Sequence, residues 1–166
     1  LRCPYCSNSE ILEEGIEISL EEIYEKIDDS ALFMDAVVVS GGEPLVQYED
    51  VIEIFKYVRE IGLKTKLDTS GVYPDRLQKI LDLGLVDYVA MDIKNSPDKY
   101  LSTCGIKSAA SSKLFDKIKE SVDFLLAQNN FPYEFRTTIV RELHDESDII
   151  DISKWISGAS AYFLQS

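Results

Sequence analysis

The sequence predicts an α/β fold in which parallel strands alternate with helices. Short apolar runs of the β type alternate with amphipathic helical runs along the chain, without a linker or a repeat of fixed period. Strands joined by crossover helices form parallel βαβ units. The 166 residues suffice for one hydrophobic core, whereas a closed eight-stranded barrel needs about 250. We therefore expect one domain, residues 1–166, built as a partial barrel or an open parallel sheet; the pattern alone fits both.

Five helices and five strands are expected, each from a local signal. Ser19 and Glu22 form a capping-box pattern at the start of the first helix. Pro74 opens the third helix and Gly84 ends it. The other helices are predicted at about 49–61, 112–128 and 146–156. The strands are predicted at 36–39, 63–67, 86–93, 133–140 and 161–164, with a looser segment at 95–111.

The charge and hydropathy of the chain exclude some classes of protein. The net charge is −13, from 17 basic and 30 acidic residues, and no basic stripe of the kind that binds nucleic acid is visible. No apolar run approaches the roughly 20 residues that span a bilayer. No signal peptide opens the chain. We therefore expect a cytoplasmic protein with neither a nucleic-acid nor a membrane partner.

The three cysteines point to metal or redox chemistry. Cys3 and Cys6 form a C-x-x-C pair, and Cys104 is distant from them in the sequence. An odd count with one close pair argues against a disulfide framework. Iron–sulfur, zinc and dithiol redox chemistry all remain open for the pair. Cys104 is expected to be inert and to lie away from the pair, and His144 to be solvated or to cap a helix; a zinc site would need all four residues to converge.

Polar and glycine residues follow four consecutive predicted strands. They are Ser40-Gly41-Gly42-Glu43-Pro44, Asp68-Thr69-Ser70-Gly71, Asp92 with Lys94, and Arg136. Each alone fits a turn, a cap or a surface ion pair. In parallel α/β folds, however, ligands bind at the carboxyl ends of the strands. The shared location therefore predicts a binding site at this rim.

Two of these motifs resemble those of the radical S-adenosylmethionine (SAM) enzymes. That family carries C-x-x-x-C-x-x-C, and Cys3-Pro4-Tyr5-Cys6 is similar to its second half, with an aromatic residue before the last cysteine. Gly41-Gly42-Glu43-Pro44 matches the glycine-rich motif of the family. The resemblance implies a partial (β/α)6 TIM-like barrel of parallel strands that lacks its first strand here. It also implies a chain truncated within the cluster motif, with the first cysteine two positions before Leu1, and truncated again near the start of a sixth strand.

Three further segments resemble the activating enzymes of glycyl-radical enzymes. They are Lys66–Gly71, Met91–Lys94 and Glu134–Thr138. Within that group they are most similar to the activating proteins of anaerobic ribonucleoside-triphosphate reductase, with pyruvate formate-lyase activating enzymes close by. The resemblance implies an oxidoreductase that takes an electron from a reducing donor, cleaves SAM and places a radical on a glycine of a partner enzyme. A radical SAM synthase acting on a nucleoside-type substrate, a zinc-binding α/β module and a non-catalytic interaction domain are the alternatives.

The resemblance also implies roles for the residues of the rim. Cys3 and Cys6 would bind iron of a [4Fe–4S] cluster, which would be absent or incomplete in a chain with two of its three ligands. Backbone groups of Gly41, Gly42 and Glu43, ahead of Pro44, would meet the SAM ammonium, and Lys94 and Arg136 its carboxylate. Ser70 would reach another polar group of SAM. The oxygens of Asp68, Thr69 and Asp92 would hold the ribose or a small cation.

Overall fold

One parallel sheet of five strands organises the molecule. The structure is a computed structural model that describes Cys3 and residues 16–106 and 111–166. The sheet runs in the order β1-β2-β3-β4-β5, and every neighbouring pair is parallel. The strands are β1 (Ala36–Val39), β2 (Lys64–Thr69), β3 (Tyr88–Asp92), β4 (Tyr133–Thr138) and β5 (Tyr162–Gln165). The predicted parallel α/β fold is confirmed.

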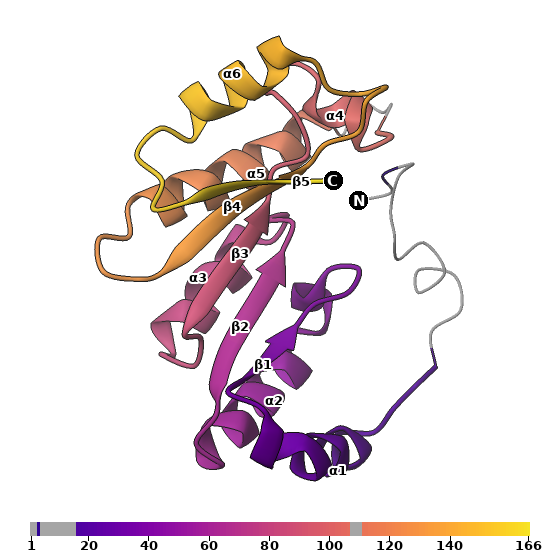
Figure 1. Cartoon of the computed structure of the whole chain (residues 1–166), viewed down its shortest axis with the longest axis vertical. Helices are drawn as coiled ribbons and strands as arrows, with labels where there is room; N and C mark the ends of the chain where they lie inside the picture. The colour runs from indigo at the N-terminus through magenta and orange to yellow at the C-terminus, as the bar shows by residue number, and fades with distance from the viewer. Residues whose placement is uncertain (1–2, 4–15, 107–110) are drawn as a thin grey trace.

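The strand order decides between the two architectures that the sequence left open. Right-handed crossovers place every connecting helix on the same face when the strand order never reverses, whereas a doubly wound sheet needs a reversal. No reversal occurs among the described strands, and the helices line one side of the sheet (Figure 1). The fold is therefore of the barrel type.

The five predicted helices are present, together with shorter elements that the sequence analysis missed. The predicted helices are α1 (Leu20–Ser30), α2 (Tyr48–Glu60), α3 (Pro74–Asp82), α5 (Ser111–Leu126) and α6 (Glu146–Trp155). The missed elements are η2 (Ala31–Phe33), η3 (Pro44–Gln47) and α4 (Tyr100–Thr103). The predicted capping box between Ser19 and Glu22 is formed, since each side chain bonds to the other's backbone N–H. None of the described helices is both long and apolar enough to cross a membrane.

Most strand boundaries differ from the prediction by one or two residues, and two of these differences have a clear local reason. β2 continues past Leu67 to Thr69, because the buried Thr69 still pairs with Met91 although its sequence resembles a turn. β3 begins later than predicted. The Asp87 carboxylate accepts the Thr65 backbone N–H at 2.9 Å, so a side chain takes the place of a strand partner.

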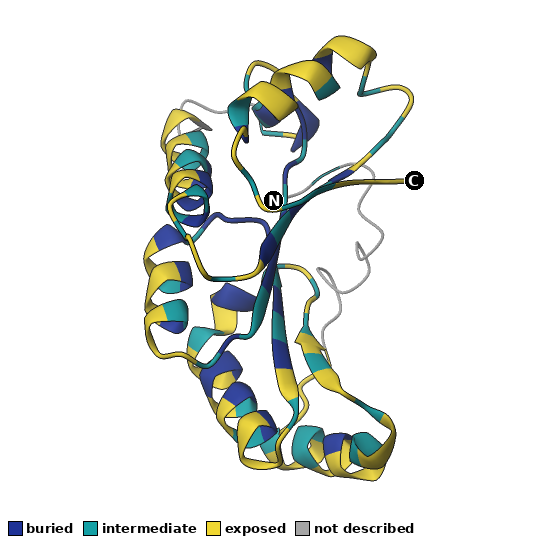
Figure 2. Ribbon diagram, turned by 60° about the vertical axis from the view of Figure 1, so that its left-hand side comes forward, coloured by how far each residue is buried: buried dark blue, intermediate teal, exposed yellow. Residues whose placement is uncertain are grey.

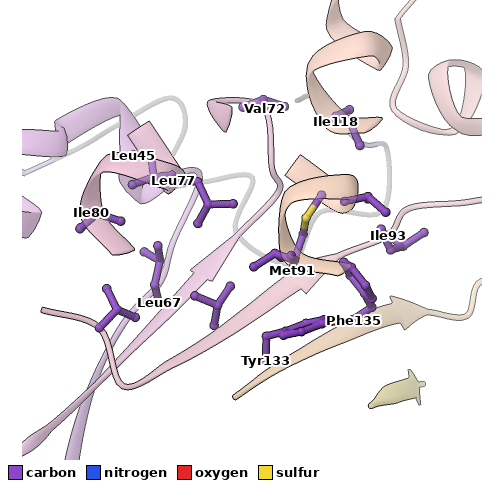
Figure 3. Packing of buried hydrophobic residues seen from close by; sticks show 14 of the residues in the cluster. Leu45, Leu67, Val72, Leu77, Ile80, Met91, Ile93, Ile118, Tyr133 and Phe135 are labelled. Carbon is purple, nitrogen blue, oxygen red and sulfur yellow. The ribbon is translucent and has the colours of Figure 1, made fainter. Parts of the chain in front are cut away.

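The core lies between the sheet and its helices. Leu67, Met91 and Phe135 project from three neighbouring strands into it and are fully buried (Figure 3). Gly71, just after β2, has φ +75°, and a Cβ there would overlap the Met91 side chain. The buried Ser121 hydroxyl of α5 donates to the Gly71 carbonyl at 2.7 Å. The chain therefore leaves the carboxyl end of β2 through a turn that favours glycine.

The opposite face of the same strands carries charge. Side chains alternate between the two faces along each strand, so every second residue lies on the face away from the helices. The charged and polar residues on that face are Lys66 and Asp68 of β2, Tyr88 and Asp92 of β3, and Glu134 and Arg136 of β4. Figure 2 shows the helices with their buried stripes toward the sheet and their exposed residues outward. The charged face is thus the concave interior of the partial barrel, which we call the open face.

Candidate functional site

Arg136 joins the carboxyl ends of three strands. Its Nη2 lies 3.1 Å from Asp68 Oδ2 and 3.1 Å from Asp92 Oδ1. Its Nε also donates to Asp92 Oδ1 at 3.2 Å. Burial opposes the charge of the guanidinium, but Asp92 and Asp68 outweigh it and raise the pKa of Arg136. The side chain, 14% exposed, is therefore a fixed cation at the rim.

Lys94 supplies a second cation beside the first. Its Nζ donates to Asp92 Oδ2 at 2.8 Å, so Asp92 is shared between Lys94 and Arg136. Two cations are thus held side by side by carboxylates of the protein. An anionic ligand could take over part of this pairing, because the cations are partly exposed and already ordered.

One carboxylate oxygen at this site is not satisfied. Asp68 Oδ1 is buried and accepts no hydrogen bond from the described residues. Lys66 Nζ lies 3.5 Å from it, close enough for an ion pair but without a hydrogen bond. Buried polar atoms in this state are uncommon and call for an explanation. A ligand hydroxyl or a cation would supply the missing partner.

A second polar group lies on the open face, nearer the amino ends of β2, β3 and β4. The Tyr88 hydroxyl donates to Glu134 Oε2 at 2.8 Å, and Lys66 Nζ lies 3.6 Å from Glu134 Oε1. Burial, followed by the bond to Glu134 and its charge, raises the pKa of Tyr88 to about 12. The phenol therefore stays neutral. Tyr88 and Glu134 were not predicted as site residues, although strict alternation along β3 and β4 would have placed them on this face.

Glu43 ties the glycine-rich loop to the loop after β2. Its carboxylate accepts hydrogen bonds from the Thr69 hydroxyl (2.8 Å), from the Ser70 N–H (2.8 Å) and hydroxyl, and from the Leu45 N–H (3.2 Å). The Thr69 and Ser70 hydroxyls are thus donors to Glu43. Their oxygens keep acceptor capacity toward a ligand. Gly41 in the glycine-rich loop has φ +130°, a backbone conformation that other residues rarely adopt.

The cysteines differ from the prediction. Cys104 is fully buried at the end of α4, and its thiol hydrogen-bonds Cys3. This bond, followed by burial, raises the pKa of Cys104 far above its usual range. The expectation that Cys104 lies away from Cys3 is therefore wrong: Cys3 packs against the same core, and α4 carries Cys104 to that point. Cys6 lies outside the described residues.

His144 holds two backbone segments together. Its Nδ1 accepts the Val140 N–H at 3.1 Å, and its Nε2 lies 2.9 Å from the Lys94 carbonyl oxygen. Asp145, not His144, caps α6. Among the described residues no three His, Cys, Asp or Glu side chains form a metal-binding group. The zinc alternative thus loses the histidine that it requires.

The predicted site residues fall into two connected groups. Asp68, Asp92, Lys94 and Arg136 are in direct contact at the ends of β2, β3 and β4. Glu43, which is followed by the buried Pro44, is bonded to Thr69 and Ser70. The two groups meet at the junction of Asp68 with Thr69. Both lie at the carboxyl end of the sheet.

Comparison with known proteins decides the family. The model of the radical SAM superfamily matches residues 1–151. The chain belongs to the radical SAM superfamily. It is 39% identical to MJ1227, a candidate glycyl-radical enzyme activating enzyme of Methanocaldococcus jannaschii, over 99% of this chain and 68% of that protein. It is also 32% identical to the pyruvate formate-lyase 1-activating enzyme of Escherichia coli, over 60% of this chain and 43% of that protein.

A solved structure supports the same fold for this radical SAM chain. Native anSMEcpe with bound AdoMet aligns with a TM-score of 0.61 and 15% identity, over 99% of this chain and 47% of that one. At this identity the likeness concerns the fold alone. It agrees with the consecutive strand order and the barrel-type sheet.

The residues present fit the groups that radical SAM enzymes use. Lys94 and Arg136 offer positive charge to a carboxylate, and Asp68 Oδ1 is a buried acceptor to which no described residue donates a hydrogen bond. Cys3 packs against the core cluster that contains Cys104, and Cys104 ends α4 in the segment that follows β3. The donor set therefore suits an anionic amino-acid group placed beside thiolate-bound iron.

Proposed function

We propose that this chain is the core of a radical SAM activating enzyme that generates a glycyl radical on a partner enzyme. The support is the combination of the motifs with the two cations at the rim. The naming of MJ1227 and of the pyruvate formate-lyase activating enzymes agrees with this activity. We further propose anaerobic ribonucleoside-triphosphate reductase as the partner, because the segments around Asp68, Asp92 and Arg136 are most similar to its activating proteins.

Each residue of the rim then has a task in binding. A [4Fe–4S] cluster, when bound, supplies the electron for reductive cleavage of SAM, and Cys3, Cys6 and one further cysteine would hold it. Backbone carbonyls of the loop at Gly41, Gly42 and Glu43 would accept the SAM ammonium protons. Glu43 keeps that loop in place through Thr69 and Ser70.

The pairing of Arg136 and Lys94 with Asp92 is the observation that carries the proposal. A carboxylate that enters between these cations replaces contacts that already exist, so little reorganisation is needed. Arg136 presents a fork suited to two oxygens, and Lys94 a compact charge. Asp68 and Asp92 would retain acceptor oxygens for the ribose hydroxyls or a small cation.

The open face suggests how a protein substrate could reach SAM. No helix covers this face among the described elements, and its strands end at the proposed SAM site (Figure 2). A glycine is a sensible target, because a radical there is stabilised by the flanking amides and no side chain hinders planarity. The net charge of −13 argues against a nucleic-acid partner.

The test uses the full-length protein, reconstituted anaerobically with iron and sulfide and then reduced. We expect 5′-deoxyadenosine and methionine as products. Electron paramagnetic resonance should show a glycyl signal with the reductase present. A signal on pyruvate formate-lyase instead would change the partner and keep the activase assignment. SAM cleavage without a glycyl signal on either protein would reject the proposed substrate.

A further inference from the structure

Hydrogen bonding between β3 and β4 continues through side chains beyond the end of the sheet. The Ile93 N–H donates to the Arg136 carbonyl at 2.7 Å. The Thr137 hydroxyl then donates to the Ile93 carbonyl at 2.8 Å. In the described part of the chain, backbone pairing of the two strands ends here. The carbonyl of the next residue, Lys94, therefore needs a donor of another kind.

His144 supplies that donor. The Val140 N–H points at Nδ1, so in the neutral ring the proton is on Nε2, which donates to the Lys94 carbonyl at 2.9 Å. Two residues earlier, the buried Tyr100 hydroxyl donates to the Asp92 carbonyl at 3.3 Å. The backbone carbonyls of Asp92 and Lys94 are thus both held by side chains.

The following residue is fixed to the same segment. The Asn95 amide is fully buried and donates to the Leu143 carbonyl at 2.9 Å. We call the His144–Lys94 and Asn95–Leu143 hydrogen bonds the β3–β4 clasp. One step further, the Ser96 hydroxyl donates to Asp148 of α6 at 2.8 Å. The clasp therefore joins the rim residue Lys94 to the start of α6.

We propose that His144 is a positioning residue that fixes the backbone of Lys94 so that its ammonium stays beside Arg136 at the SAM carboxylate site. The inference rests on the proposed role of Lys94. A lysine ammonium sits on a flexible four-carbon stem, so its place depends on where its backbone is held. Ordering the backbone before SAM arrives lowers the entropy that binding must overcome.

Two substitutions separate the two hydrogen bonds of His144. His144→Asn keeps an acceptor near the position of Nδ1 for Val140 and cannot reach Lys94. His144→Gln keeps a donor near the position of Nε2 for Lys94 and gives up Val140. Both variants, and Lys94→Met, are made in the full-length reconstituted protein. Iron content, melting temperature, SAM dissociation constant and amide hydrogen exchange of the Lys94–Ser96 segment are measured for each.

We expect His144→Asn to weaken SAM binding about fivefold, as for one hydrogen bond, and to speed up exchange in that segment. His144→Gln should stay within about twofold of the parent, and both should keep their iron. Equal SAM affinity in the two variants would overturn the positioning role, whether or not the melting temperature falls. If Lys94→Met itself leaves SAM affinity unchanged, the proposed role of Lys94 fails and the positioning role fails with it. If only Lys94→Met weakens binding, the role of Lys94 stands and that of His144 is rejected.

Discussion

Alternate residues of the same strands face two different environments in this molecule. Phe135 and Arg136 are neighbours in β4, yet Phe135 is fully buried under the helices and Arg136 joins two carboxylates on the open face. The helix-covered face is apolar and closely packed, as Figure 3 shows around Met91. On the open face the charged side chains pair with one another, and among the described residues only Lys66, at 3.5 Å and without a hydrogen bond, approaches Asp68 Oδ1. The difference shows that one strand packs the apolar core with one face and presents paired charges on the other.

The largest loss of stability should come from truncating a side chain on the helix-covered face. Phe135→Ala removes a fully buried ring, and we expect a loss of about 3–5 kcal/mol in the free energy of unfolding. Phe163→Ala is the matched control, because Phe163 lies beside Arg136 on the open face and is 51% exposed. Its effect should stay within about 0.5 kcal/mol. Urea unfolding of both variants gives the two values. Equal losses would show that the two faces do not differ as described.

The next largest loss of stability concerns the turn at Gly71, just after β2. Gly71→Ala combines a left-handed backbone with an overlap on Met91, so we expect a loss of about 2–4 kcal/mol. Gly84→Ala is the control, because Gly84 has a similar φ of +65° but an added Cβ would have no described neighbour beyond the adjacent residues within 4 Å. It should cost only about 1 kcal/mol. The same unfolding measurement applies. A loss at Gly71 no larger than that at Gly84 would argue against the close packing of Met91.

A substitution on the open face should lower the affinity for SAM. Arg136→Gln removes a charge-assisted contact worth about 1.5–3 kcal/mol, so SAM affinity should fall at least about tenfold. Iron content should stay at the parent level. Arg136→Lys keeps the charge without the fork and should give an intermediate affinity. Calorimetric titration of the reconstituted full-length protein measures both. Parent-like affinity of Arg136→Gln would remove Arg136 from the proposed site.

The smallest effect is a pH dependence of the stability that Asp148 contributes near the β3–β4 clasp. Burial raises the pKa of Asp148, but hydrogen bonds from Lys99, from the Asp145 backbone and from Ser96 outweigh it and lower the pKa. A lowered pKa in the folded state stabilises the fold above the unfolded value of about 3.9. That stability is lost as the pH falls through the folded value.

The difference in stability between the parent and Asp148→Asn should therefore be present at neutral pH and shrink below about pH 4. Urea midpoints at several pH values measure it. Asp151→Asn changes an exposed carboxylate of the same helix and is the control. A difference that stays constant down to pH 2 would show that the ionised Asp148 does not stabilise the fold.

Much of the fold could be predicted because its signals are local. The Ser19 capping box and Pro74 at a helix start both depend on neighbours within a few residues, and both are formed. The end of β2 was missed, because Thr69 follows Asp68 in what looks like a turn and only the pairing with Met91 keeps it in the strand. The strand order, which separates a partial barrel from an open sheet, is a long-range property and needed the structure.

The sequence indicated which polar residues lie at the carboxyl rim of the sheet, but not how their side chains pair. Polar residues after consecutive strands indicated the rim, because parallel strands end at one edge. That Arg136 bridges Asp68 and Asp92, or that Glu43 holds Ser70, depends on side chains far apart in the sequence. Cys104 was misplaced for the same reason: nothing near it in the sequence indicates Cys3.

The consecutive strand order also bears on how the chain acquires its structure during synthesis. Each described strand pairs with the strand made just before it, from β1 to β5. A ribosome that releases the chain from its amino end would therefore expose, at each stage, a sheet edge whose next partner is the segment emerging next. No described strand must wait for a partner encoded much later, and the loops closed at each step are about one βα unit long. The described sheet can therefore grow by one strand and one helix at a time, because each new strand pairs with the edge that the previous strand left.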